Sequence, residues 1–423
     1  MGDRNWAGNV EFRSAVTHRP GTIDELRALV VGSPRIRVLG SRHSFNEIAD
    51  GDVSVCLDAL PHDVVVDTTA STVAINPATT YGQLASILQH HDLALHNLAS
   101  LPHISVGGAI ATATHGSGDR FGNLATAVSA IEILRSDGEI VHLDRTDPDF
   151  DGAVVNLGAL GVMVGLELDV EPAYDAVQHV FEGLAWDSLS SNFDAITAAG
   201  DSVSLFTTYA ADHIEQVWVK RRLPARHPQL DLTPGLFGAR PALVDVHPIV
   251  GVSAESCTPQ LGVPGLWSDR MPHFKLDFTP SSGDELQSEL FVPRHAALAA
   301  IGALRSLAGE MAPLLMISEV RTVAADTLWL SPHYGRDTVA FHFTWRRDPA
   351  AVAPILTRIE TALAEFEPRP HWGKLFTLEA STIAERYPRH ADFVDLANRF
   401  DARRAFRNEW LERNVFVDQI AAR

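Results

Sequence analysis

Residues 35–46 read RIRVLGSRHSFN, and this stretch decides the expected fold of the N-terminal region. Its first five residues are typical of a short buried strand, which Gly40 ends by permitting backbone geometry that a β-carbon would resist. A helix is expected before the strand, because Thr22 and Glu25 have the spacing of a capping box. The order helix, strand and glycine turn lets the backbone face a phosphate while His43 faces the ring system of the same ligand.

A short motif recurs by chance, so the run around His43 alone does not separate a functional histidine from an ordinary loop residue. A second segment bears on this choice. Residues 97–118 contain no Asp, Glu, Lys or Arg and are rich in Gly, Ala, Ser and Thr. Glycine-rich segments let backbone N–H groups approach a pyrophosphate closely, and threonine hydroxyls add donors. The run GSGDRFG at 116–122 is not a dinucleotide fingerprint, because its last spacing is wrong and no helix is expected to open there. A purely structural glycine-rich loop is the alternative.

Polar residues also share one face of the expected strands in the second half of the chain. Glu319 and Arg321 are two residues apart, so strand geometry places both side chains on the same face. His342 and Thr344 share a face by the same rule, and Lys374 follows an aromatic residue and a glycine. Such a set of donors and acceptors suits a polyhydroxylated neutral ligand. The alternative for Glu319 and Arg321 is a solvent-exposed salt bridge.

Length and composition restrict the class of protein. A chain of 423 residues exceeds the usual single core, so two domains are expected. Hydrophobic residues at 46% and charged residues at 21% are ordinary globular values. A net charge of −19 argues against nucleic acid or an anionic membrane surface as a partner. No signal peptide or membrane-spanning run is recognisable, and Cys56 and Cys257 are expected to be unpaired thiols in a reducing cytoplasm. His90 and His91 are adjacent, which is not a metal-ligand spacing.

The expected strands and helices are short before Pro172 and longer after it. Before it, short strands and helices alternate, with hairpins predicted at 64–75 and 131–143 and a helix capped by Thr80 and Gln83. After it, longer elements predict an antiparallel sheet covered by helices, with a helix beginning at Pro293. Strands are expected at 204–209, 216–220, 273–279, 314–323, 339–345 and 375–377. The arginine-rich end of the chain is expected to be helical.

Taken together, these segments resemble the vanillyl-alcohol-oxidase-type covalent flavoproteins, and most closely their alditol oxidase (xylitol oxidase) branch. The matching runs occur in the family's order: VLGSRHSFN at 38–46, ASLPHISVGG at 99–108, THGSG at 114–118, EVRT at 319–322 and HWGK at 371–374. The resemblance implies an α+β fold with an FAD-binding domain of the vanillyl-alcohol-oxidase (PCMH) type at 1–172. It further implies a substrate-binding domain at 173–380, with an antiparallel sheet covered by helices, and a segment at 381–423 that returns to the FAD domain.

The resemblance also implies the cofactor and its site. His43 matches the histidine that carries FAD covalently through the 8α-methyl carbon, and no cysteine lies near 107–108 to make a second link. Arg42 stands where some relatives have glycine, and an arginine beside a pyrophosphate is chemically reasonable. The other FAD contacts implied are Val38, Leu39, Gly40, Ser41, Arg42, Ser44, Ser100, Ser105, Gly108, Ala111, Thr112, Ala113, Thr114, His115, Gly116, Gly161, Val162 and Met163.

The activity implied is oxidation of the terminal primary alcohol of alditols such as xylitol and sorbitol to the aldose, with reduction of O2 to H2O2. The substrate contacts that match are Ser100, Glu319, Arg321, Thr344 and Lys374, and the catalytic set is Arg321, Lys374, Glu319 and His342. The formal base is left open among Glu319, Lys374 and His342. The expected partners are a small polyol and O2, for a monomer in the cytoplasm that binds no nucleic acid or membrane.

Two alternatives remain at this level. An aldonolactone oxidase or dehydrogenase, acting on L-gulono- or L-galactono-lactone, shares the histidine–tryptophan–x–lysine and glutamate–x–arginine elements. Ala99, at the position thought to gate oxygen, does not decide between oxidase and dehydrogenase. A catalytically silent binding protein would be expected to lack one of His43, Glu319, Arg321 or Lys374, and the chain has all four.

Overall fold

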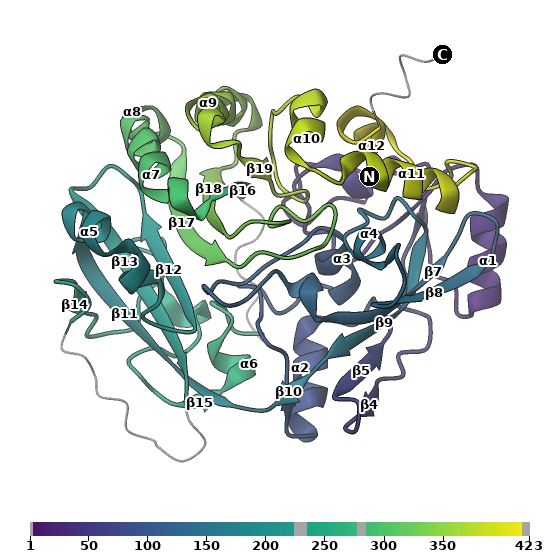
Figure 1. Cartoon of the computed structure of the whole chain (residues 1–423), viewed down its shortest axis with the longest axis horizontal. Coiled ribbons are helices and arrows are strands. Elements are labelled where there is room, and N and C mark those ends of the chain that lie inside the picture. The colour runs from purple at the N-terminus through teal and green to yellow at the C-terminus, as the bar shows by residue number, and fades with distance from the viewer. Residues whose placement is uncertain (1–2, 224–234, 277–284, 417–423) are drawn as a thin grey trace.

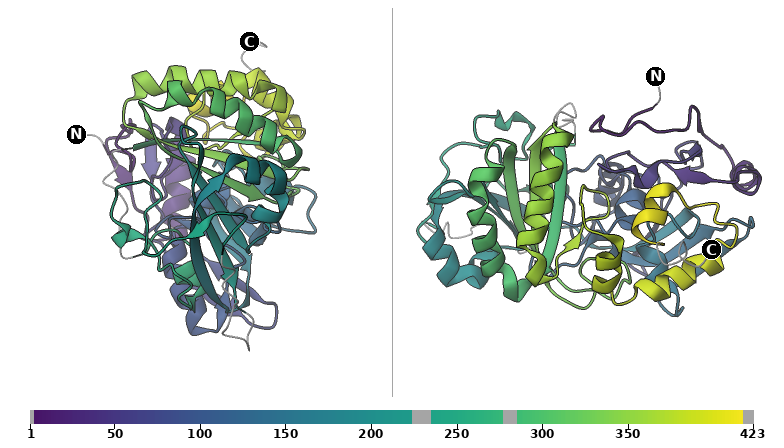
Figure 2. Two further views of the ribbon diagram at one scale, coloured as in Figure 1. Left: turned by 90° about the vertical axis from the view of Figure 1, so that its left-hand side faces the viewer. Right: turned by 90° about the horizontal axis from the view of Figure 1, so that it is seen from above.

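The computed structural model describes residues 3–223, 235–276 and 285–416. Two halves lie side by side: one contains a five-stranded sheet and the N-terminal helices, and the other contains a nine-stranded sheet (Figure 1). The C-terminal helices lie with the first half rather than with the large sheet (Figures 1 and 2). The expected α+β class, an antiparallel sheet covered by helices beside a second α/β unit, is confirmed.

The predicted order of helix, strand and turn is found at the start of the chain. Helix α1 (Ile23–Gly32) begins where the Thr22 side chain accepts the N–H of Glu25. Strand β2 (Ile36–Val38) then pairs in parallel with β3 (Val53–Val55), which also pairs with β1 (Thr17–His18). The turn at Gly40 therefore leaves the end of β2 as predicted.

The five-stranded antiparallel sheet has the order β4-β5-β9-β7-β8, and both predicted hairpins are confirmed. Helix α2 (Tyr81–His90) begins with the full capping box of Thr80 and Gln83. A two-stranded sheet joins β6 to β10. The remaining bounds in this half are β4 (Val65–Asp67), β5 (Thr72–Ile75), β6 (Leu93–Ala94), α3 (Val106–Ala111), β7 (Val128–Leu134), β8 (Ile140–Asp144), α4 (Phe150–Val154), β9 (Val162–Asp169) and β10 (Glu171–Pro172).

The large sheet has the order β14-β11-β13-β12-β17-β18-β16-β19, and β15 pairs with β11. Its strands are β11 (Asp175–Ala185), β12 (Ser202–Thr207), β13 (His213–Arg222), β14 (Arg240–Pro241), β15 (Gly265–Leu266), β16 (Glu285–Pro293), β17 (Leu315–Val323), β18 (Thr338–Arg346) and β19 (Arg369–Pro370). The helices between them are α5 (Trp186–Thr197), α6 (Trp267–Arg270), α7 (Ala297–Ser306), α8 (Ala308–Met311) and α9 (Pro349–Ala362).

The two faces of this sheet differ in chemistry, because successive side chains of a strand alternate. One face is apolar: Phe341, Phe343 and Trp345 of β18 are 0% exposed and share a core with α5, α7 and α9. Burying side chains of this size contributes on the order of 2–3 kcal/mol each. The opposite face carries His342 and Thr344 and lines a cavity. The helices therefore cover the apolar face of the sheet, and the polar face is left to line the cavity.

The structure corrects several expectations. Strand β16 was not predicted, although the polar residues Glu285, Gln287 and Glu289 recur at every second position in its first half. In place of a strand at 273–279, Phe274 makes an isolated bridge with Cys257, and 277–279 lie outside the described residues. In place of a strand at 375–377, Leu375 makes a single bridge to Ser288. Residues 107–108 lie in the short helix α3 rather than in an open loop.

The C-terminal helices α10 (Ala380–Arg386), α11 (His390–Phe400) and α12 (Glu409–Asn414) confirm the expected helical end, within the described residues. Phe393 and Leu396 of α11 belong to the same hydrophobic core as Ile131 of the five-stranded sheet. The buried side chain of Arg37 links the C-terminal region to β2, the strand before the turn at Gly40. Its guanidinium donates to Phe406 O and to Gly158 O, each at 2.7 Å. Among the described residues, no helix has the length and apolar character needed to span a bilayer.

Candidate active site

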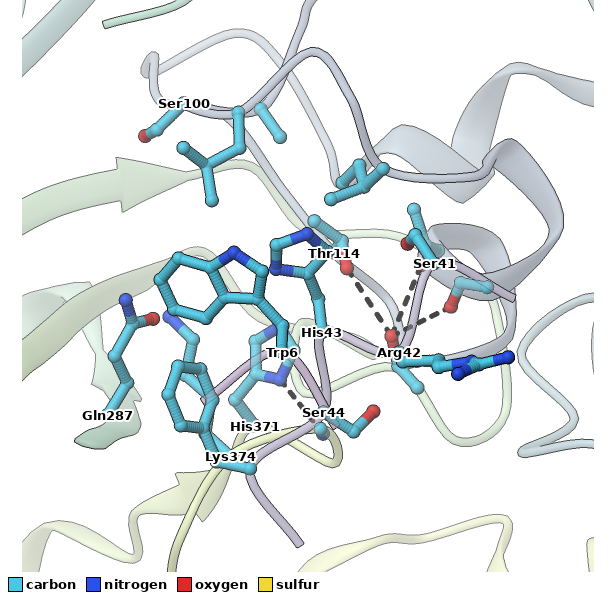
Figure 3. Close-up of a pocket in the computed structure, with 18 of the residues that line it drawn as sticks. Trp6, Ser41, Arg42, His43, Ser44, Ser100, Thr114, Gln287, His371 and Lys374 are labelled. Carbon is cyan, nitrogen blue, oxygen red and sulfur yellow. Dashed lines mark hydrogen bonds between the residues drawn. The ribbon is translucent and has the colours of Figure 1, made fainter. Parts of the chain in front are cut away.

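A cavity of about 590 Å³ is lined by residues of both halves. One wall is formed by the turn after β2, the segment around α3 and the loop before β9; the other is formed by the polar face of β16, β17 and β18. Figure 3 shows Ser41, Arg42 and Thr114 on one side, Gln287 and Lys374 on the other, and His43 and Trp6 between them. The segments singled out in the sequence therefore meet at one place.

The turn at Gly40 packs tightly against the start of α3. A Cβ on Gly40 would lie 2.5 Å from Ser105 Oγ, so this approach requires glycine. Ser105 N donates to Ser41 Oγ at 3.2 Å, and Ser41 N donates to Ser105 Oγ at 3.3 Å. Arg42 has a φ of 61°, in the left-handed region, which is uncommon for a residue other than glycine. The result is a narrow cradle of bare backbone and hydroxyl groups, which fits the phosphates and ribose of a dinucleotide.

His43 is held between two other rings beside this cradle. Its ring centroid lies 5.0 Å from that of Trp6 and 4.5 Å from that of His103. Burial, with His103 nearby, lowers the pKa of His43 to about 3. The imidazole is therefore neutral at physiological pH and keeps a lone pair on one nitrogen, which is the form that can act as a nucleophile.

Arg42 lines the cavity, but its guanidinium also forms an ion pair with Asp3, with 2.8 Å between Nη1 and Oδ2. Trp6 N donates to Arg42 O at 2.8 Å. The N-terminal segment is thereby tied to the turn by one backbone and one side-chain contact.

Most of the FAD contacts expected from sequence line this cavity, and three do not. Those that line it are Val38, Leu39, Gly40, Ser41, Arg42, His43, Ser44, Ser100, Ser105, Gly108, Ala111, Thr112, Thr114, His115, Gly161 and Met163. Ala113 and Val162 are packed in hydrophobic cores. Gly116 lies against the chain at 97–98, where a Cβ would be 2.6 Å from Leu98 O.

The polar face of the large sheet brings the expected substrate residues together. Glu319 pairs in register with His342, which pairs in turn with Glu289, so these three residues form a row across β17, β18 and β16. Glu319 is 4% exposed and Arg321 is 6% exposed. The prediction that both share a face is confirmed, and the alternative of a solvent-exposed salt bridge is wrong. Thr344 and Lys374 line the same cavity, as does Ser100 from the opposite wall.

A buried network of charges lies on this face. Glu289 Oε1 is 2.7 Å from Arg321 Nη2, and Glu289 Oε2 is 2.7 Å from Lys374 Nζ. Glu319 Oε1 is 2.8 Å from His273 Nε2, and its other oxygen is 3.6 Å from Arg321 Nε. Burial alone would raise the pKa of Glu289, but the charges of Lys374, His115 and Arg321 outweigh it and hold that pKa well below its usual range. Burial would likewise raise the pKa of Glu319, but Arg321 and His273 outweigh it and lower that pKa, so both carboxylates are ionised.

The same surroundings set the protonation of the basic groups. Burial lowers the pKa of Lys374, and the carboxylate of Glu289 opposes that effect. Burial also lowers the pKa of Arg321, but Glu319 and Glu289 outweigh it, and the net shift is upward. Burial, with Lys374 beside it, lowers the pKa of His342 to about 3. At neutral pH the carboxylates of Glu289 and Glu319 and the guanidinium of Arg321 are therefore charged, the Lys374 amine is paired with Glu289, and the His342 imidazole is neutral.

The tautomer of His342 follows from its neighbours. Gln287 Nε2 donates to Glu285 Oε1 at 2.7 Å, which turns the amide oxygen of Gln287 toward His342. That oxygen accepts from His342 Nε2 at 3.1 Å. The neutral ring therefore carries its lone pair on Nδ1.

Several cavity residues were missed from sequence, chiefly Trp6, Gln287, Glu289, His273 and His371. The two-residue spacing of Glu285, Gln287 and Glu289 was the available signal, since it places these side chains on one face of a strand. His371 stands in the HWGK run that was already quoted. His273 reaches Glu319 from 46 residues away in the chain, a contact that no local pattern predicts.

Comparisons with known proteins agree with this geometry. A family model described as an FAD binding domain matches residues 14–144, and one described as D-arabinono-1,4-lactone oxidase matches residues 284–414. An alditol oxidase from a Streptomyces species is 48% identical over 411 residues, covering 96% of this chain and 97% of that protein. An L-gulono-1,4-lactone dehydrogenase from Mycobacterium tuberculosis is 28% identical, covering 97% of this chain and 98% of that protein.

Among solved structures, cholesterol oxidase from B. sterolicum superposes with a TM-score of 0.78 at 14% identity. The match covers 97% of this chain and 96% of that chain. At that identity the likeness shows a shared fold and carries nothing about the substrate.

Proposed function

Because the chain belongs to the alditol oxidase family of FAD-dependent oxidoreductases, we propose that it oxidises the terminal primary alcohol of alditols such as xylitol and sorbitol. The product is the aldose, and O2 is reduced to H2O2. The observation that carries this assignment is the buried polar face of Glu319, Arg321, Thr344 and Lys374. Such a face offers charged and neutral partners to successive hydroxyl groups, and a relative that is 48% identical over 411 residues is named an alditol oxidase.

FAD, when bound, supplies the hydride acceptor at the substrate and the electrons that reduce O2. We propose that the turn at residues 40–44, the start of α3 and the hydroxyl groups of Thr112 and Thr114 hold it. A covalent bond through His43 is part of the proposal. It is supported by the neutral imidazole and by the position of His43 in the wall of the cavity.

The side chains of the sheet face then have distinct roles. Arg321 and Lys374 hold the reacting hydroxyl and stabilise negative charge as it develops on that oxygen. Glu319, which is ionised, accepts hydrogen bonds from neighbouring hydroxyls. Ser100 and Thr344 bind further hydroxyls along the polyol. His342 is held neutral with its lone pair on Nδ1, so this nitrogen can accept a hydrogen bond from a substrate hydroxyl, and the formal base stays open among Glu319, Lys374 and His342.

We propose that residues 1–172 and 381–423 form the FAD-binding unit and that 173–380 form the substrate-binding unit. The shared core of α11 and the five-stranded sheet supports the first part. The single helix-covered sheet, from β11 to β18, supports the second. A monomer and a cytoplasmic location stay predictions.

An aldonolactone oxidase or dehydrogenase is the second candidate, because the lactone oxidase model matches the region that contains Glu319, Arg321 and Lys374. The higher identity to an alditol oxidase favours the first. Anaerobic mixing with xylitol tests the reaction type. With one xylitol per flavin, bleaching of the flavin with formation of one aldose, followed by release of one H2O2 when O2 is admitted, is the expected result. A flavin that stays oxidised would reject the proposal.

A further inference from the structure

A buried carboxylate that the proposed chemistry does not use lies beneath its two cations. Glu289 of β16 is 1% exposed, and its two oxygens contact three basic side chains from three separate segments. Oε1 meets Arg321 Nη2 of β17 at 2.7 Å and His115 Nε2 at 3.2 Å, while Oε2 meets Lys374 Nζ at 2.7 Å. Both side-chain oxygens of Glu289 are thus engaged by basic side chains.

Glu289 and Glu319 contact different sets of basic side chains. Glu319 contacts His273 and Arg321, whereas Lys374 has its ion pair with Glu289. A buried cation needs a partner, because desolvation disfavours its charged form unless an anion compensates. Lys374 stands on the loop that follows β19, so Glu289 also ties that loop to β16.

The contact with His115 extends the network to the cofactor wall. His115 Nδ1 lies 2.7 Å from Gly116 O, and its ring is buried beside Phe291. His115 follows Thr114, which lines the cavity with it. Glu289 is therefore the point at which the sheet face, the loop bearing Lys374 and the segment after α3 are joined.

We propose that Glu289 is a positioning residue that fixes Arg321 and Lys374 relative to each other and supplies the counter-charge of the Lys374 amine. This inference rests on the proposed function only in that Lys374 acts on the substrate hydroxyl. Glu289 itself touches no reacting atom.

The sign of the effect follows from the charges around Lys374. The titratable groups that face this network are Glu289, Glu319, Arg321, His115, His273, His333, His342 and His371, from β16, β17, β18 and the adjoining loops. Burial lowers the pKa of Lys374, and Glu289 is the largest influence that raises it. If that carboxylate becomes an amide, the pKa of Lys374 falls further. Because the charged amine exists below its pKa, the alkaline limb of the reaction must then move to lower pH.

Replacement of Glu289 by glutamine tests this, since the amide has nearly the same shape without the charge. The rate of flavin reduction by xylitol would be measured anaerobically from pH 6 to pH 10 in wild type and Glu289→Gln. We expect the alkaline limb to move by at least one pH unit toward acid, with a rate loss of at least tenfold at pH 9. Glu289→Asp, which keeps the charge, should retain the limb near its wild-type position. Glu360→Gln is the matched control, because Glu360 is a buried carboxylate bonded to Thr377, away from the cavity.

A second variant keeps the inference testable if Glu289→Gln does not fold. In Lys374→Arg the guanidinium stays charged over the whole range, so the alkaline limb should disappear. A readout that does not depend on turnover is xylitol binding, followed by the shift of the flavin absorption spectrum. Binding by Glu289→Gln should weaken at pH 9 relative to pH 7 more than binding by wild type does.

Unchanged pH profiles for Glu289→Gln, or an alkaline limb that persists in Lys374→Arg, would overturn the inference. Neither result touches the proposed function, which fails only if no alditol reduces the wild-type flavin.

Discussion

The indole of Trp6 lies 5.0 Å, between ring centroids, from the imidazole of His43. The N-terminal segment therefore covers the turn after β2, and the backbone bond from Trp6 N to Arg42 O fixes it there. With His103 on another side, the His43 ring is enclosed and neutral. A neutral imidazole at the cavity wall supports the proposed covalent attachment of FAD.

Replacement of His43 by alanine should abolish that attachment. The wild-type protein precipitated with acid is expected to keep its yellow colour in the pellet, whereas His43→Ala should release FAD to the supernatant. His62→Ala serves as a control, because His62 lies on the exposed surface. Flavin that stayed bound to the polypeptide in His43→Ala would show that another residue carries it.

Loss of either cation of the sheet face should slow the chemical step more than binding. Lys374→Ala and Arg321→Ala each remove a donor that strengthens as the substrate oxygen becomes charged, at a cost of about 3 kcal/mol, on the order of 10²-fold. The rate of flavin reduction in an anaerobic stopped-flow experiment is the measurement. Arg358→Ala, which removes an exposed arginine paired with Glu310, should leave that rate unchanged. A reduction rate in Lys374→Ala equal to that of wild type would exclude Lys374 from the mechanism.

Buried histidines should make the fold sensitive to mild acid. Burial lowers the pKa of His96 to about 4, and unfolding restores the ordinary value of about 6.5. The unfolded state then binds more protons, so stability is fully present above pH 6.5 and is lost progressively as the pH falls toward 4. Between pH 6.5 and pH 5 this histidine alone accounts for about 2 kcal/mol.

The free energy of unfolding of wild type and His96→Gln, measured in urea at pH 7 and pH 5, tests this. The variant should be less destabilised by the change in pH, even if it is less stable at both values. Equal losses in the two proteins would show that His96 does not titrate on unfolding.

Local sequence patterns predicted much of the secondary structure, because helix capping and strand alternation depend only on residues that are close in the chain. Thr80 and Gln83 form the capping box expected at the start of α2, and the alternation at Glu319 and Arg321 placed both on one buried face. A strand was expected at 273–279, but its described part, 273–276, pairs only through Phe274. Strand pairing depends on partners far along the chain, and hydropathy alone does not supply them.

The site was predictable where a residue belonged to a recognised run, as for His43 and Lys374. It was not predictable where the role depends on a contact between distant segments. His273 reaches Glu319, and Glu289 joins β17 to the loop of Lys374, only once the sheet has formed. Ala113 and Val162 were among the expected FAD contacts, yet both side chains pack in hydrophobic cores.

Substrate preference tests the proposed activity most directly. A face that binds successive hydroxyls should give a lower kcat/KM for shorter or deoxygenated analogues. These analogues lack some of the hydroxyls, so buried donors and acceptors of the site are left without partners. The measurement is kcat/KM from peroxide release for xylitol, sorbitol, glycerol, a 1-alkanol and the L-gulono- and L-galactono-lactones. Xylitol and sorbitol should exceed glycerol, the alkanol should be a poor substrate, and the product should be the aldose. Either lactone clearly exceeding every alditol would contradict the proposed activity and favour an aldonolactone oxidase.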